Sequence, residues 1–204
     1  MKNIVYVFLV SMLVSCNNKE VLLPQVDRTI VATVEDHSPI YMFFETKEKD
    51  TLVDLNRKNS ISSTNWIFNI DKRLPLKLVI PEVIKMQAKK SGSMHNNAES
   101  QNYFSYSDSI HKKLAFVPFT KVVYKLEKPK TGVTIYFSKN RILVDSVEFN
   151  KEKLEEYIEN LTIEDLYKCN FCFDKNDSYG NFVKNYVFAT TLEVKRTQTD
   201  TYIF

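Results

Sequence analysis

The sequence predicts an α+β fold made of small mixed sheets with helices on one face. Short segments rich in Val, Ile, Tyr and Phe are separated by polar turn residues, which is typical of strands. Apolar residues at i, i+3, i+4 and i+7 within 154–161 indicate an amphipathic helix. In the C-terminal third, such segments follow the order strand, strand, helix, strand, helix, strand, which favours an α+β unit.

The N-terminal half is expected to contain four strands and one helix. A turn at 35–39 divides the segment 29–44 into two strands, and residues 51–55 and 65–70 form two more. Pro81 is expected at the first position of the helix, because proline is favoured there.

Residues 91–109 are predicted to be a mobile loop, because they contain few aliphatic side chains. The segment 115–126 regains strand character. Lys128-Pro129-Lys130-Thr131-Gly132 then separates a predicted N-terminal unit, 28–127, from a predicted C-terminal unit, 131–204.

The C-terminal unit is expected to begin with a hairpin that pairs 134–137 with 141–147. Two helices should follow, and side chains of Asn150 and Ser178 are suited to cap them, because each can accept a hydrogen bond from a first-turn amide. Further strands are expected at 167–173 and 194–204.

The segment 1–15 is predicted to be a secretory signal peptide. Lys2 precedes an apolar stretch, 4–14, that falls short of the roughly 20 residues a spanning helix needs. Leu13-Val14-Ser15-Cys16 resembles the lipobox of bacterial lipoproteins, which implies that Cys16 carries a diacylglyceryl anchor. The alternative is an ordinary secretory signal that ends near a cysteine. Residues 16–27 are then expected to form a polar, lipidated tether.

The charge balance argues against a nucleic-acid partner. Removal of Lys2 with the signal peptide leaves 27 Lys and Arg against 25 Asp and Glu, without the basic clusters that phosphate contacts require. Only three glycines occur in the chain, which disfavours phosphate-cradling loops. The mature chain that begins at Cys16 has a length that suits one domain or two small ones.

Short matches between the two halves suggest an internal repeat, although such matches also arise by chance. They occur in the same order in both halves, at offsets of 95, 91 and 103 positions. The pairs are Ile40-Tyr41 with Ile135-Tyr136, Leu52-Val53-Asp54 with Leu143-Val144-Asp145, and Phe68-x-x-Asp71-Lys72 with Phe171-x-x-Asp174-Lys175.

The C-terminal unit resembles the periplasmic domain of the ExbD/TolR family of biopolymer-transport proteins. The similar features cover most of the unit 131–204, and the segment 65–86 is a weaker second match, so two such units in tandem are the expectation. The resemblance implies a dimerising, partner-binding role. Family members also have a transmembrane helix with a proton-coupling aspartate, which this sequence lacks, so proton conduction is not implied. The matching segments are Ser138 to Val144, Lys151 to Leu161, Phe171-Cys172-Phe173-Asp174-Lys175, Tyr179-Gly180 and Phe182-Val183.

No residue pattern predicts an enzyme, a metal or a cofactor. Cys169 and Cys172 form a CxxC pair within a predicted strand, and we expect core cysteines, with a disulfide or redox role as the alternative. The segment 174–178 resembles a calcium loop but has Tyr179 where glycine is required, so a turn and helix cap explain it better. The three histidines, His37, His95 and His111, lie in predicted turns or in the loop.

These observations predict a lipid-anchored cell-envelope protein of non-enzymatic, protein-binding or scaffolding type. It would lie on the periplasmic or outer-membrane side, bind an envelope protein or itself, and take part in biopolymer transport or energy transduction. The alternative is a lipoprotein that captures a saccharide or a peptidoglycan fragment. The predicted contact residues are the aromatic side chains of Trp66, Tyr103, Phe104 and Tyr106.

Overall fold

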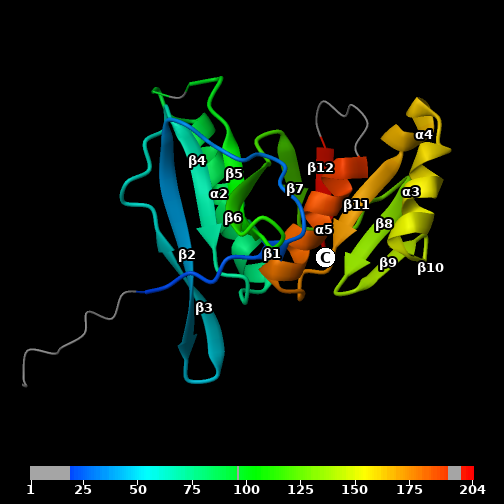
Figure 1. Cartoon of the computed structure of the whole chain (residues 1–204), viewed down its shortest axis with the longest axis horizontal. Helices are drawn as coiled ribbons and strands as arrows, with labels where there is room; N and C mark the ends of the chain where they lie inside the picture. Colours follow the sequence, from blue (N-terminus) through cyan, green and yellow to red (C-terminus); the bar gives the residue numbers. More distant parts are fainter. Residues whose placement is uncertain (1–18, 96, 193–198) are drawn as a thin grey trace, which may run out of the picture.

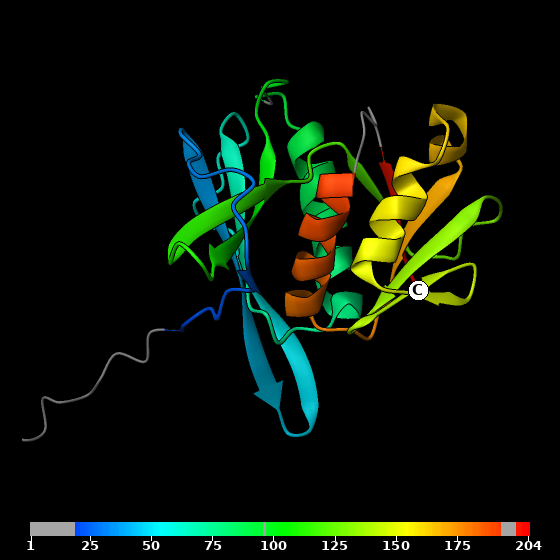
Figure 2. The same cartoon turned by 45° about the vertical axis from the view of Figure 1, so that its right-hand side comes forward.

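A computed structural model of the chain describes residues 19–95, 97–192 and 199–204. The predicted signal peptide and Cys16 lie outside the described residues. Two six-stranded sheets enclose helices α2 (Leu76–Ser91) and α5 (Tyr179–Leu192), as Figures 1 and 2 show. The fold is therefore α+β with mixed sheets, as the sequence predicts. Within the described part of the chain, no helix is long and apolar enough to cross a membrane.

The first sheet has the strand order β1-β5-β4-β2-β3, and β6 also pairs with β5. Strands β2, β4 and β5 are parallel, whereas β3 and β6 run antiparallel to their neighbours. Its strands are β1 (Gln25–Val26), β2 (His37–Lys47), β3 (Asp50–Asn56), β4 (Asn65–Ile70), β5 (Asn102–Asp108) and β6 (Lys113–Pro118).

The second sheet has the order β10-β9-β8-β11-β12-β7. Two further helices, α3 (Lys151–Glu159) and α4 (Ile163–Tyr167), connect β10 to β11. Its strands are β7 (Val122–Lys125), β8 (Val133–Ser138), β9 (Arg141–Val144), β10 (Val147–Phe149), β11 (Cys169–Phe173) and β12 (Thr199–Ile203).

Four strands of each sheet share one topology. The series β5-β4-β2-β3 has the same directions and connectivity as β12-β11-β8-β9. The register also agrees, because Ile40 pairs with Phe68 and Ile135 pairs with Phe171. The topology therefore agrees with the internal repeat suggested by the sequence.

The two hairpins of the repeat differ in length. Tyr41 pairs with Asn56 in the first hairpin, whereas the equivalent Tyr136 pairs with Leu143, which is much nearer to it in the sequence. The first hairpin is therefore the longer one, and it projects from the body of the molecule (Figure 2). For this reason, the sequence match of 52–54 with 143–145 aligns residues that follow the turns of the two hairpins, but the cross-strand partners of these residues are not equivalent.

The two repeats join where α2 and α5 begin. Pro75 and Ser178, which are 103 positions apart, form an antiparallel bridge. Four backbone hydrogen bonds surround this bridge and form two pairs. In each pair, the donor and acceptor of one bond lie 103 positions from the donor and acceptor of the other, and the two bonds run in opposite directions between the repeats. This is the pattern of an approximate twofold axis. These bonds are Leu76 N to Asp177 O (3.0 Å) with Tyr179 N to Leu74 O (2.7 Å), and Lys77 N to Lys175 O (2.8 Å) with Gly180 N to Lys72 O (2.9 Å).

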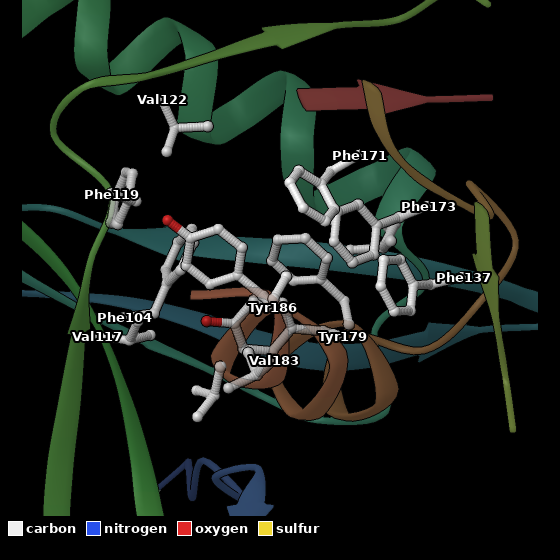
Figure 3. Close-up of a cluster of buried hydrophobic side chains, with 14 of the residues drawn as sticks. Phe104, Val117, Phe119, Val122, Phe137, Phe171, Phe173, Tyr179, Val183 and Tyr186 are labelled. Atoms are coloured by element: carbon white, nitrogen blue, oxygen red, sulfur yellow. The ribbon is translucent and has the colours of Figure 1, made fainter. Parts of the chain in front are cut away.

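One hydrophobic core spans both repeats, and Figure 3 shows its aromatic centre. Phe104 of β5 stacks on Phe119 with ring centroids 3.8 Å apart, and it makes T-shaped contacts with the rings of Tyr179, Phe182 and Tyr186 of α5. Because α5 belongs to the second repeat and β5 to the first, this packing holds the two repeats together.

Several local predictions are confirmed. Strand β4 has the predicted bounds, and Asn150 accepts a hydrogen bond from Lys153 N at 2.8 Å as a helix cap. Ser178 Oγ likewise accepts from Asn181 N at 3.2 Å at the start of α5. Asp174 and Asp177 accept hydrogen bonds from backbone amides in and around the turn, as expected for a turn that leads into a helix.

Other predictions are wrong. Helix α2 begins at Leu76, and Pro81 lies inside its first two turns rather than at the first position. The segment 29–44 contains one long strand, because residues 27–36 instead cross the first sheet. Tyr167 ends α4, so the strand after it begins at Cys169.

The predicted mobile loop 91–109 contains the central strand β5. Its sequence combines aromatic with small polar residues. Ser105 is fully buried, and its hydroxyl is satisfied by hydrogen bonds to Phe68 O and Asn69 Oδ1. The missing aliphatic residues are therefore replaced by aromatic rings and satisfied hydroxyls.

The sheets divide the chain differently from the predicted units. Strand β7 falls within the predicted N-terminal unit 28–127 but pairs with β12 of the second sheet. Part of the predicted tether 16–27 is also ordered. Leu22 bonds to Lys72 N and Asp71, and Pro24 O and Val26 O accept hydrogen bonds from the end of β5.

Candidate functional site

The predicted aromatic contact residues belong mainly to the core. Trp66, Phe104 and Tyr106 are at most 1% exposed, and the Trp66 indole donates to Ile61 O at 2.7 Å. Tyr103 is partly buried, packed against Val34, Ile67 and Phe116. The prediction that these rings lie exposed for a ligand is therefore wrong for three of the four, because they lie on the internal strands β4 and β5.

The outer face of the first sheet is covered by the chain itself. After β1, residues 27–36 run along the edge of β6, where Val31 bridges Phe116, and then reach the outer face of the sheet, where Val34 packs with Ile67. Backbone bonds between Val31 and Phe116, at 2.9 and 3.0 Å, fix this segment. This segment, which is not a regular strand, thus places two valines against that side of the sheet.

The equivalent face of the second sheet is less covered. The linker before β8, 126–132, contains no buried residue. We call the four partly exposed side chains beside it the open face. The open face consists of Leu143, Tyr136, Tyr202 and Phe204.

The strand register places the open face across the sheet. Leu143 of β9 pairs with Tyr136 of β8, and Cys172 of β11 lies between Tyr136 and Tyr202 of β12. The rings of Tyr136 and Phe204 have centroids 5.3 Å apart, and Lys128 Nζ lies 5.4 Å from the Phe204 ring centroid. The result is an aromatic strip across three strands of the sheet.

A pocket of about 420 Å³ opens between this strip and the linker. Tyr136, Phe204 and Leu143 provide apolar and aromatic surface. The polar part of the wall comes from Lys128, Thr134, Asp145 and Ser146. Aromatic rings beside hydroxyl, carboxylate and ammonium groups can bind either a peptide segment or a sugar.

Both cysteines of the CxxC pair are buried. Cys169 belongs to the hydrophobic core, as predicted, whereas Cys172 lies on the open-face side of the sheet, between Tyr136 and Tyr202. Each is at most 2% exposed, and they are not joined in a disulfide. Burial raises the pKa of the Cys172 thiol to about 12. This thiol is therefore protonated at neutral pH, which disfavours nucleophilic chemistry.

A second cavity, of about 410 Å³, lies between α2 and the chain that leads into β7. Its wall includes Lys90, which is only 4% exposed and has its pKa lowered to about 8 by burial. Lys90 Nζ donates to Asn102 Oδ1 at 3.1 Å and Gln101 O at 3.2 Å, and lies 5.1 Å from the Trp66 ring centroid. These contacts show how the fold accommodates the ammonium group.

The sequence carries only a partial signal for these sites. Tyr136 alternates with the buried residues Ile135 and Phe137, so its outward orientation follows from the strand pattern. Its exposure does not, because exposure depends on how the linker 126–132 crosses the sheet. Helical spacing places Lys90, unlike Lys89, on the same face of α2 as the buried Val83 and Met86, but a lysine at such a position is not by itself a sign of burial.

Comparison with known proteins adds no relative from which a role could be read. No family model, curated protein or solved structure matches this chain.

Proposed function

We propose that this chain is a lipid-anchored cell-envelope protein of non-enzymatic type that binds another envelope protein through the open face. The observation that carries the proposal is the contrast between the two sheets. The first sheet is covered by residues 27–36, whereas the second keeps an aromatic strip accessible. Accessible aromatic surface beside a polar rim is typical of protein-binding sites.

The covered sheet indicates what kind of partner segment the open face would accept. Val31 pairs with the edge strand β6 through its backbone, and Val34 fills the apolar surface on the outer face of the first sheet. By analogy, the partner would present an extended segment with two or more apolar side chains, which would fill the pocket beside Tyr136 and Phe204. A role in scaffolding follows, because one end of the chain would hold the membrane and the other a partner.

The resemblance to the ExbD/TolR periplasmic domain suggests biopolymer transport or energy transduction as the setting. Members of that family dimerise. Here, two repeats within one chain meet around the Pro75–Ser178 bridge, so a single chain would supply both halves. The lipid on Cys16 would replace the family's transmembrane helix as the attachment.

Photo-crosslinking in the producing bacterium tests the protein-binding role. A benzoylphenylalanine residue in place of Tyr136 should crosslink to an envelope protein, and mass spectrometry should map the adduct to an extended apolar segment. Tyr167 of α4, which is 59% exposed and lies off the open face, is the matched control position. Equal crosslinking from both positions would contradict the proposal. Palmitate labelling that depends on Cys16 tests the anchor separately.

Capture of a saccharide or peptidoglycan fragment is the second candidate, and the same pocket favours it. Tyr136 and Phe204 offer ring faces on which a sugar could stack, beside the polar groups of Thr134, Asp145 and Lys128. Titration calorimetry with soluble muropeptides distinguishes the candidates. Binding that Tyr136→Thr abolishes would favour saccharide capture, and absence of heat alongside a mapped protein crosslink would favour the protein partner.

A further inference from the structure

The part of the chain that the structure describes begins at Lys19, three residues after the proposed lipidation site Cys16. Lys19 Nζ forms an ion pair with Asp54 Oδ2 at 2.6 Å and also contacts Glu45, so the chain is held against the β2–β3 hairpin from this residue onward. Only three residue steps separate Cys16 from Lys19, and they span at most about 11 Å. A lipid on Cys16 would therefore hold this side of the protein near the membrane surface.

A basic surface lies beside this point of attachment. Lys72 N donates to Leu22 O, and Lys72 O in turn accepts from Gly180 N at the junction of the repeats. Bonds between the same loops bring further basic residues to this end of the molecule, through Lys77 N to Lys175 O and Lys139 N to Asp177 Oδ2. We call this surface the basic end; its members are Lys72, Arg73, Lys77, Lys139, Arg141 and Lys175.

The acidic groups at this end neutralise it only in part. Asp71 is buried and accepts hydrogen bonds from the Arg73 guanidinium, and Asp177 is 5% exposed and bonded to Lys139 N and Asn181. Asp174 is partly exposed and bonded to Ser138. Among the described residues, Arg73 is the one member of the basic end that forms an ion pair. Six positive charges against three negative ones leave an excess of three.

The hairpin nearest the attachment point offsets only part of this excess. Its turn carries Lys47 and Lys49 beside Glu48 and Asp50, which balance each other. Lys19 balances one of its two partners, Glu45 and Asp54, so one negative charge remains there, and the exposed Glu20 adds a second. The excess positive charge is thus located at the junction of the repeats, where both α2 and α5 begin (Figure 1).

We propose that the basic end lies against the anionic headgroups of the membrane that holds Cys16, so that the domain has one defined orientation. The attachment to the membrane rests on the proposed lipidation of Cys16, whereas the attraction of the basic end to anionic headgroups does not require the lipid. Juxtamembrane Lys and Arg residues are attracted to anionic lipids, and the attraction falls off within a Debye length.

Binding of the unlipidated protein to vesicles tests the charge pattern. The mature Cys16→Ser protein should sediment with phosphatidylglycerol-containing vesicles but not with pure phosphatidylcholine, and salt should release it. The triple variant Lys77→Glu, Lys139→Glu, Lys175→Glu should bind more than about tenfold more weakly. The control reverses the same number of charges elsewhere, at the exposed residues Lys58, Lys89 and Lys121, and should bind nearly as well as the parent. Equal losses in both triple variants would overturn the proposal.

Depth-dependent quenching tests the orientation in the lipidated chain. A fluorophore on Asn176→Cys, at the basic end, should be quenched by headgroup-spin-labelled lipid, whereas one on Ser91→Cys, at the other end of α2, should not. Equal quenching at both positions in a palmitate-labelled protein would refute the inference and leave the anchor intact. Failure of palmitate labelling with vesicle binding retained would refute the anchor alone.

Discussion

Replacement of Lys90 by methionine should change the pH dependence of stability. Lys90 is 4% exposed, and burial lowers its pKa from 10.5 to about 8. Because its pKa is lower in the folded state, the unfolded chain binds more protons between those two pH values. The free energy of unfolding should therefore rise with pH in that window. At about 1.36 kcal/mol per pKa unit, the burial of the charge costs about 3 kcal/mol at pH 7, and about 2 kcal/mol of this is regained by pH 9.5.

Urea unfolding of the parent and of Lys90→Met at several values between pH 7 and 9.5 measures this effect. The parent should gain stability relative to Lys90→Met as pH rises, because methionine keeps most of the length of the side chain but does not titrate. Taking the difference between variants cancels other groups that titrate in the same range. Lys89→Met, at the exposed neighbouring position, should follow the parent. Parallel curves for the parent and Lys90→Met would refute the reasoning.

Three further predictions concern the interior. Tyr179→Phe should leave the free energy of unfolding in urea unchanged or raise it by up to about 1 kcal/mol, because the buried Tyr179 hydroxyl has no hydrogen-bond partner among the described residues. Tyr186→Phe is the control and should lower it by about 1 kcal/mol, because it loses a 2.9 Å hydrogen bond to a backbone oxygen. In the Cys16→Ser protein, Cys172 should react with a thiol reagent at pH 8 only after unfolding, because burial raises its pKa to about 12; rapid reaction of the folded protein would contradict its burial. Gly132→Ala should lower the free energy of unfolding by at least about 2 kcal/mol, because Gly132 has φ +90° and an added Cβ would lie 2.2 Å from a carbonyl oxygen. Gly92→Ala, at φ −81°, is the control and should have a smaller effect. Equal shifts of the melting temperature in the two variants would argue against backbone strain at Gly132.

The parts of the fold that local sequence determines are predicted well. The alternation in 65–70 identifies β4, and the side chain of Asn150 caps α3 within its own first turn. Strand β5 could not be recognised, because its buried polar residues are satisfied by partners far away in the sequence, as Ser105 is by Asn69. Such a hydrogen bond cannot be predicted from neighbouring residues, so the composition of this segment indicates a loop although it forms a strand in the folded protein.

The candidate site shows the same division. The outward orientation of Tyr136 follows from strand alternation, but the open face exists because the linker 126–132 covers less of its sheet than residues 27–36 cover of theirs. That difference emerges only when the two sheets are compared. The basic end likewise combines residues from loops far apart in the chain, such as Lys72 and Lys139, and no single segment of the sequence carries the cluster.

The central claim is that the open face binds an extended segment of an envelope protein. Titration calorimetry of the mature Cys16→Ser domain with a synthetic peptide of the crosslinked segment tests it most directly. The peptide should bind saturably; Tyr136→Thr should weaken this binding by more than about tenfold and Tyr167→Thr should leave it unchanged, since an aromatic residue at the centre of an interface commonly contributes about 2 kcal/mol or more. Equal affinity of the parent and Tyr136→Thr for that peptide would contradict it.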